Sequence, residues 1–150
     1  MLGKPKQKRS QDRINKILQT AESILEHEST DALTIAKISE MAGLKRTSTY
    51  KFFETPDDIK LGLIQIYIKN CNQALITNLQ INSNADYAAC LKDSVDIMIE
   101  FFRANLGAQK LILENNVTPP VLSSELHKIA DSILKHVEGS VGLPNMFNKP

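Results

Sequence analysis

The sequence feature that most constrains the fold is a pair of short segments within residues 34–53, joined at Gly43. In residues 35–42, apolar side chains recur at three- and four-residue spacing, which predicts a short amphipathic helix. Thr34 stands directly before this helix, where its hydroxyl can accept a hydrogen bond from a backbone N–H of the first turn. Gly43 follows where the helix ends and where a chain often enters left-handed backbone space, which glycine adopts at little cost.

The second segment, residues 46–52, follows Leu44 and is expected to turn polar side chains outward and aromatic side chains inward. Two helices joined by a short turn that contains glycine form the helix-turn-helix, whose second helix enters the major groove of DNA. The pattern therefore predicts DNA binding by residues 34–53.

The rest of the chain shows helical spacing and no strand alternation, so the expected fold class is all-α. Residues 1–9 are polar, basic and interrupted by Pro5, which favours a flexible arm. Thr55-Pro56-Asp57-Asp58 joins a hydroxyl cap, a first-turn proline and two carboxylates, and predicts the start of a long helix. Residues 95–102 are apolar on more than one face, which predicts burial on several sides, and Gly107 is expected to end that helix. The expected helices cover about residues 10–28, 35–42, 46–52, 56–79, 86–105, 108–115 and 118–137.

Charge is distributed unevenly along the chain, although the net charge is only +1. Residues 1–51 hold ten Lys and Arg against six Asp and Glu, whereas residues 52–150 hold eight against eleven. A basic end on an acidic body suits a protein that offers one face to phosphates. A chance asymmetry of a few charges is the alternative.

Several other classes of protein find no support in the sequence. Cys71 and Cys90 lack metal or redox spacing and are expected to be buried, reduced thiols, and the nine residues between His127 and His136 do not suit a metal pair on a helix. No glycine-rich phosphate loop, nucleophile elbow or Cys–His pairing points to an enzyme, so no catalytic residues, metal or cofactor are predicted. No signal peptide and no apolar run of membrane-spanning length is found, which favours a cytoplasmic protein without a membrane partner.

The helix of residues 10–28, the ending Ala42-Gly43-Leu44, the Tyr50…Phe53 pattern and the acidic start of the long helix together resemble the TetR family of bacterial transcriptional regulators. The resemblance covers about residues 10–75 and is looser beyond them. It implies a three-helix DNA-binding domain (10–55) behind the arm (1–9), and a helical regulatory domain (56–150) that binds a small effector and forms a homodimer. It also implies repression through a palindromic double-stranded DNA operator, with release by the effector.

The resemblance carries site roles over to particular positions of this chain. Thr34 matches a residue that bonds a backbone phosphate, and Tyr50 matches a tyrosine whose hydroxyl points towards DNA. Chemistry independently suits Arg46 for a bidentate contact to guanine, and Lys8 and Arg9 of the arm for phosphates or for a minor groove. The expected DNA-binding residues are Thr34, Lys45, Arg46, Thr47, Ser48, Tyr50 and Lys51.

This chain also departs from the family pattern. Lys45 stands where the family usually has a Ser or Thr that caps the recognition helix. Thr49 stands where leucine is common, and Phe52 where histidine or tyrosine is common. Pro56 stands where many members have a lysine that reaches a phosphate. Relatives usually continue with two further helices that form the dimer interface, so this chain is either truncated or a shortened member that associates differently. A helical protein-interaction domain with a degenerate, non-DNA-binding helix-turn-helix is the alternative function.

A cluster of aromatic, sulfur-containing and polar residues is a candidate lining for an apolar effector. The alternative is that these side chains only pack the body of the protein. The candidate ligand-binding residues are Tyr67, Cys71, Met98, Phe101, Phe102 and Asn105.

Overall fold

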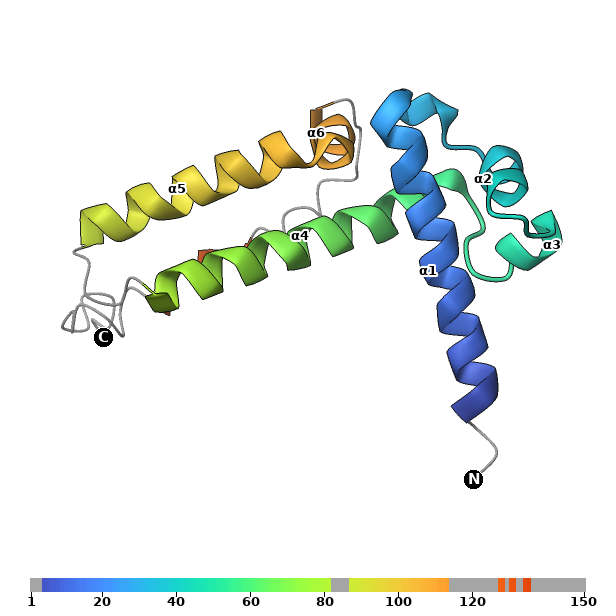
Figure 1. The fold of residues 1–150 in the computed structure, drawn as a ribbon, viewed down its shortest axis with the longest axis horizontal. Coiled ribbons are helices and arrows are strands. Elements are labelled where there is room, and N and C mark those ends of the chain that lie inside the picture. The colour runs from blue at the N-terminus through green and yellow to red at the C-terminus, as the bar shows by residue number, and fades with distance from the viewer. Residues whose placement is uncertain (1–3, 82–86, 114–126, 129, 132–133, 136–150) are drawn as a thin grey trace, which may run out of the picture. The chain divides into compact units, whose positions relative to one another are not determined.

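The computed structural model describes residues 4–81, 87–113, 127–128, 130–131 and 134–135. All secondary structure in these residues is helical (Figure 1), which confirms the all-α class for this part of the chain. None of the described helices is long and apolar enough to cross a membrane. The elements are α1 (Lys4–His27), a 3-10 turn η1 (Thr30–Ala32), α2 (Ile35–Met41), α3 (Arg46–Thr49), α4 (Pro56–Ile81), α5 (Tyr87–Ala104) and α6 (Leu106–Leu113).

Contacts divide the chain into two compact units. The first unit comprises Met1–Gln65 and Leu106–Val117, and therefore holds α1, η1, α2, α3, the start of α4 and α6. The second unit comprises Ile66–Asn105 and Thr118–Pro150, and holds the rest of α4 and α5. The division falls within α4 rather than at residue 55, and the expected domain boundaries stay a prediction.

The core of the first unit is built on the apolar face of α1. That face packs against α2 and α6, and its fully covered side chains fall at the three- and four-residue spacing seen in the sequence. Burying one Leu or Ile side chain contributes about 1.5–3 kcal/mol. Gly62 of α4 lies close to Leu18, because a Cβ placed there would meet a methyl of Leu18 at 3.1 Å. Deeply buried residues of this core include Ile17, Ala21, Ile24, Leu25, Leu33, Ile38, Ile59, Leu63, Ala108 and Leu111.

The start of α1 corrects the expectation of an arm at residues 1–9. Residues 4–9 form the first turns of α1 rather than an irregular segment. Pro5 lies in the first turn, where its missing N–H has no helical partner to lose, and the Lys, Gln and Arg residues that follow are good helix formers. The proline therefore starts the helix instead of preventing it.

The other end of α1 is capped by a side chain from α6. The ammonium of Lys110 donates to the carbonyl oxygens of Leu25 at 2.7 Å and of Glu28 at 2.9 Å. Such carbonyls have no partner within their own helix, so the contact satisfies both and places a positive charge at the negative end of the helix.

The second unit contains an expectation that proved wrong. Residues 95–102 were expected to be buried on several sides, but Val95 and Ile99 are 47 % and 43 % exposed. Leu91, which is 39 % exposed, lies on the same face of α5, because residues 91, 95 and 99 are four positions apart. This face of α5 is therefore not covered by the described residues. Helix α5 ends at Ala104, close to the expected residue 105, but Asn105 rather than Gly107 closes it. The amide N–H of Asn105 donates to the carbonyl of Phe101 at 3.1 Å, and its side chain does so at 2.7 Å. Gly107 lies inside α6.

Candidate nucleic-acid interface

The segment of residues 34–53 folds as two short helices joined by a turn. Thr34 is the N-cap of α2, and its hydroxyl accepts a hydrogen bond from the N–H of Lys37 at 3.2 Å. The N–H of Leu44 donates to the carbonyl of Ser39 at 2.8 Å, and that of Gly43 to the carbonyl of Glu40 at 3.0 Å. This pair of bonds is the Schellman ending, and it needs the positive φ of 62° that Gly43 adopts. The predicted cap and the predicted glycine ending are both confirmed.

A buried hydrogen bond fixes α3 against α2. The hydroxyl oxygens of Ser39 and Thr49 lie 2.8 Å apart, and the two residues are only 1 % and 0 % exposed. In the sequence alone, Thr49 stands out only as a departure from the leucine common in the resembled family. Two hydroxyl residues ten positions apart, each on the inner face of its helix, are the signal that could have found this pair.

Helix α3 itself is a single short turn, Arg46–Thr49, shorter than the expected residues 46–52. Lys45 is the N-cap of α3, but the Lys45 side chain makes no capping hydrogen bond. The backbone closes the turn instead, because the carbonyl of Lys45 accepts from the N–H of Ser48 at 2.8 Å. Phe52 and Phe53 are half-buried, whereas Tyr50 is 53 % exposed. The expectation that aromatics turn inward therefore holds for the two phenylalanines but not for the tyrosine.

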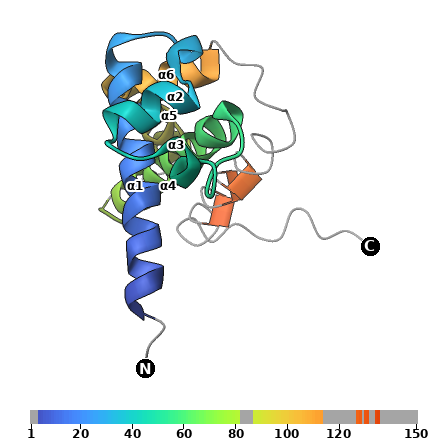
Figure 2. The same ribbon diagram turned by 90° about the vertical axis from the view of Figure 1, so that its right-hand side faces the viewer.

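The expected DNA-binding residues are accessible to a ligand. Ser48 is half-buried, and the other six are exposed: Thr34, Lys45, Arg46, Thr47, Tyr50 and Lys51. On a helix, position 50 lies four residues from position 46 and three from position 47, so Tyr50 lies beside both Arg46 and Thr47. In Figure 2, α2 and α3 lie towards the viewer, in front of α1 of the same unit.

Positive charge on this surface is not neutralised within the described part of the chain. Lys45, Arg46 and Lys51 form no ion pair with any described residue. By contrast, Lys37 pairs with Glu28 at the far end of α2, and Lys60 pairs with Asp57 at 3.0 Å. The charges on and beside α3 thus remain available to an anionic partner.

The candidate effector residues all belong to the second unit. Tyr67 and Cys71 of α4 are buried, and burial raises the pKa of the Cys71 thiol, as expected for an unreactive core cysteine. Phe101 and Phe102 are half-buried, and their rings meet edge to face with centroids 5.6 Å apart. Met98 and Asn105 are half-buried, and the Asn105 side chain is engaged by the end of α5. Their role in ligand binding stays a prediction, and the side chain of Cys90, like residues 118–126 and His136, lies outside the described residues.

Comparison with known proteins does not place the chain in a family. No protein-family model matches it, and no curated protein is similar to it in sequence.

Proposed function

We propose that this protein is a TetR-like transcriptional regulator that binds double-stranded DNA through α2, the turn and α3. One observation carries the proposal: a short helix fixed by a buried hydroxyl pair exposes Lys45, Arg46 and Thr47, and both cations lack ion pairs among the described residues. Two helices joined by a glycine turn suit insertion of the second helix into a major groove.

Each side chain contributes by its chemistry. Arg46 donates two parallel hydrogen bonds to guanine, a contact worth about 1–3 kcal/mol of discrimination against the wrong base. Thr47 and Ser48 offer hydroxyls to base edges or phosphates. Thr34, Lys45 and Lys51 bind phosphates, which fixes the register of the protein on the duplex without specifying sequence.

Regulation follows from the same resemblance. The protein acts in the cytoplasm as a homodimer on a palindromic operator, with recognition helices about 34–36 Å apart, or a multiple of a helical turn. A small apolar effector binds among Tyr67, Cys71, Met98 and their neighbours in the second unit and releases the repressor.

The test is a titration of the full chain with the DNA that flanks its own gene. Binding at low salt is expected, and Arg46→Ala should weaken it by about 1–3 kcal/mol and relax the preference at one base pair. Arg103→Ala, an exposed arginine on α5, is the matched control and should leave affinity unchanged. Failure of the unaltered chain to bind any such duplex at low salt rules out the proposal.

The second candidate is a helical interaction domain whose α3 no longer binds DNA. Two exposed apolar side chains favour it, since Met41 is 55 % and Tyr50 53 % exposed, and Phe52 and Pro56 replace polar family residues. Charge reversal by Lys45→Glu with Arg46→Glu separates the two candidates. A regulator loses DNA affinity, whereas an interaction domain shows no DNA affinity to lose and keeps its protein partner.

A further inference from the structure

Basic side chains without ion pairs occur on a second surface of the first unit, the N-terminal half of α1. Arg9, Arg13 and Lys16 are exposed, and no ion pair joins them to another residue that the structure describes. Elsewhere the described cations are often engaged: Lys92 pairs with Asp96 at 2.7 Å, and Arg103 with Glu100 at 3.0 Å.

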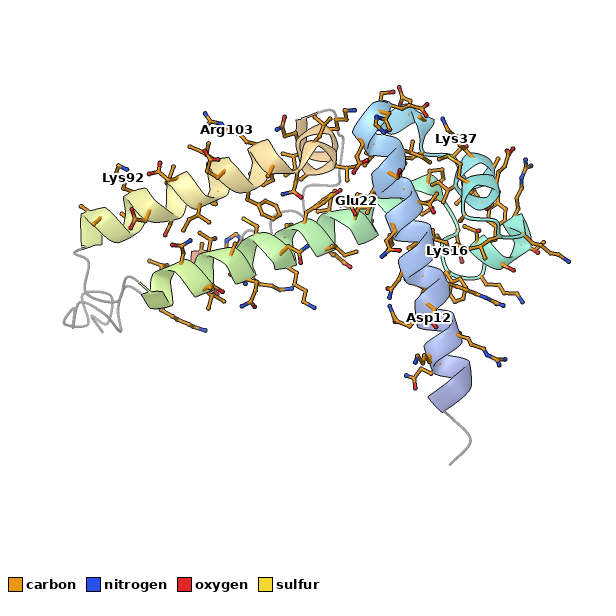
Figure 3. All side chains as sticks on the ribbon, in the orientation of Figure 1. Asp12, Lys16, Glu22, Lys37, Lys92 and Arg103 are labelled. Carbon is orange, nitrogen blue, oxygen red and sulfur yellow. The ribbon has the colours of Figure 1, made fainter. Side chains whose placement is uncertain are left out.

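The helical geometry of α1 gathers these three side chains on one face. At 3.6 residues per turn, Arg9, Arg13 and Lys16 fall within an arc of about 60° and span about 10 Å along the helix axis. We call these three residues the basic stripe. Asp12 lies at its edge, about 40° from Lys16, and Lys8 lies about 100° from Arg9 on another face. Figure 3 labels Asp12 and Lys16 on this half of α1, and Figures 1 and 2 both show its first turns extending past α2 and α3.

The charge of this segment is unfavourable for the helix itself. Residues 4–16 hold six Lys and Arg against one acidic residue, and the first turn of α1 has no acidic side chain. Cations at the start of a helix oppose its dipole, and like charges four residues apart, such as Arg9 and Arg13, repel each other. A bound polyanion removes both penalties, which a merely solvated face would leave in place.

We propose that the basic stripe binds the phosphate backbone of the duplex whose major groove receives α3. The inference rests on the proposed function and adds a second contact surface to it. It also replaces the expectation of an arm in a minor groove, because a helix about 10–12 Å across does not enter a groove about 6 Å wide. A strand presents one phosphate per roughly 3.4 Å of duplex axis, and each guanidinium can grip a phosphate with two hydrogen bonds.

Salt dependence of binding is the measurement. The triple variant Arg9→Gln, Arg13→Gln, Lys16→Gln is titrated against a random-sequence duplex of about 30 bp by fluorescence anisotropy. Each lost phosphate contact makes the negative slope of log K against log salt shallower by about 0.9. Losing all three contacts should therefore make the slope shallower by about 2.7 for each chain bound to the duplex. Between about 50 and 200 mM salt, the unaltered chain should therefore lose about fortyfold more affinity than the variant.

Two controls separate position from net charge. Lys69→Gln, Lys92→Gln, Arg103→Gln removes the same charge from exposed positions on α4 and α5 and should leave the slope unchanged. Lys8→Gln alone should change the slope less than Arg13→Gln alone. Asp12→Asn keeps all three stripe residues and removes the negative charge beside them, so it should make the slope steeper. This variant tests the stripe even if the triple variant folds poorly.

The outcomes distinguish the two levels of the proposal. If the unaltered chain binds no duplex, both the proposed function and the stripe fail. If Arg46→Ala weakens binding but the triple variant keeps the slope of the unaltered chain, the stripe alone is refuted. A triple variant that loses only binding to vesicles containing anionic lipid assigns the stripe to a membrane surface and also overturns the inference.

Discussion

The hydroxyl pair of Ser39 and Thr49 shows how one polar contact fixes the angle between two short helices. Helix α3 has a single turn and cannot be stable by itself, so its position depends on what its inner face touches. Leucine, common at this position in the resembled family, would offer packing alone. Thr49 instead forms a directional bond of 2.8 Å in a place that water does not reach. At this scale, the orientation of the proposed recognition helix depends on two oxygen atoms.

A double-mutant cycle tests that dependence. Thr49→Val keeps the shape but leaves the Ser39 hydroxyl buried without its partner, so it should lower the free energy of unfolding by about 1–3 kcal/mol. Adding Ser39→Ala removes the hydroxyl that Thr49→Val leaves without a partner. The double variant should therefore lose about 1 kcal/mol less free energy of unfolding than the two single variants together. Thr47→Val, exposed on the same helix, serves as the control in urea denaturation and should change stability by less than about 0.5 kcal/mol. Strictly additive losses would mean that the hydroxyls do not interact.

At the scale of elements, the start of α4 is stabilised by a reciprocal cap. The Asp58 carboxylate accepts from the backbone N–H of Thr55 at 2.8 Å and from its hydroxyl at 2.9 Å, while the Thr55 hydroxyl accepts from the N–H of Asp58 at 3.2 Å. The bonds that Thr55 donates, first from its backbone and then from its hydroxyl, hold the pKa of Asp58 below its ordinary value of 3.8. Two of the four residues that predicted this helix start, Thr55 and Asp58, thus make its cap through their own side chains.

The lowered pKa of Asp58 has a definite consequence for stability against pH. Because the folded state binds the Asp58 proton less tightly than the unfolded chain, the cap contributes in full above the unfolded value of 3.8. Its contribution is lost as pH falls through the lower folded value. Asp58→Asn should therefore destabilise the protein near neutral pH but much less in strong acid, as followed by thermal melts across pH. Asp96→Asn, on α5, is the control, and an equal pH dependence in both variants would contradict the role of the cap.

The elements that sequence could predict are those whose cause lies within a few residues. The caps at Thr34 and Thr55, and the glycine ending at Gly43, each depend on neighbours no more than five positions away. Most of the expected DNA-binding residues were found accessible for the same reason, because local helical spacing places them. The prediction of an arm at the start of α1 is wrong because Pro5 lies in the first turn, where a helix tolerates proline.

What sequence could not predict depends on partners far along the chain. The Ser39–Thr49 bond depends on the angle at which the turn sets the two helices. The contact of Lys110 with α1 joins residues 82 and 85 positions apart. The exposure of Val95 and Ile99 likewise depends on what covers α5, whereas their spacing says only that they share a face.

At the scale of the whole molecule, the chain leaves the first unit within α4 and returns to it at α6. The ammonium of Lys110 makes a polar contact between this returning helix and the last turn of α1. A charged donor to two otherwise unpaired carbonyls contributes more to the free energy of unfolding than an exposed ion pair does. Removal of the ammonium would leave both carbonyl acceptors without a partner. The cap therefore closes a loop whose ends, Leu25 and Lys110, lie 85 positions apart.

Lys110→Met, which keeps the length of the aliphatic stem, should lower the free energy of unfolding by about 1–2 kcal/mol. Lys92→Met removes a lysine whose partner is Asp96, four residues away on the exposed side of α5, and should cost no more than about 0.5 kcal/mol. Hydrogen exchange should locate the difference, since fraying of the last turn of α1 would speed exchange at Glu28, whose N–H donates to Ile24 at 2.9 Å. Equal losses in the two variants, with unchanged exchange at Glu28, would show that α6 is held by its buried apolar side chains alone.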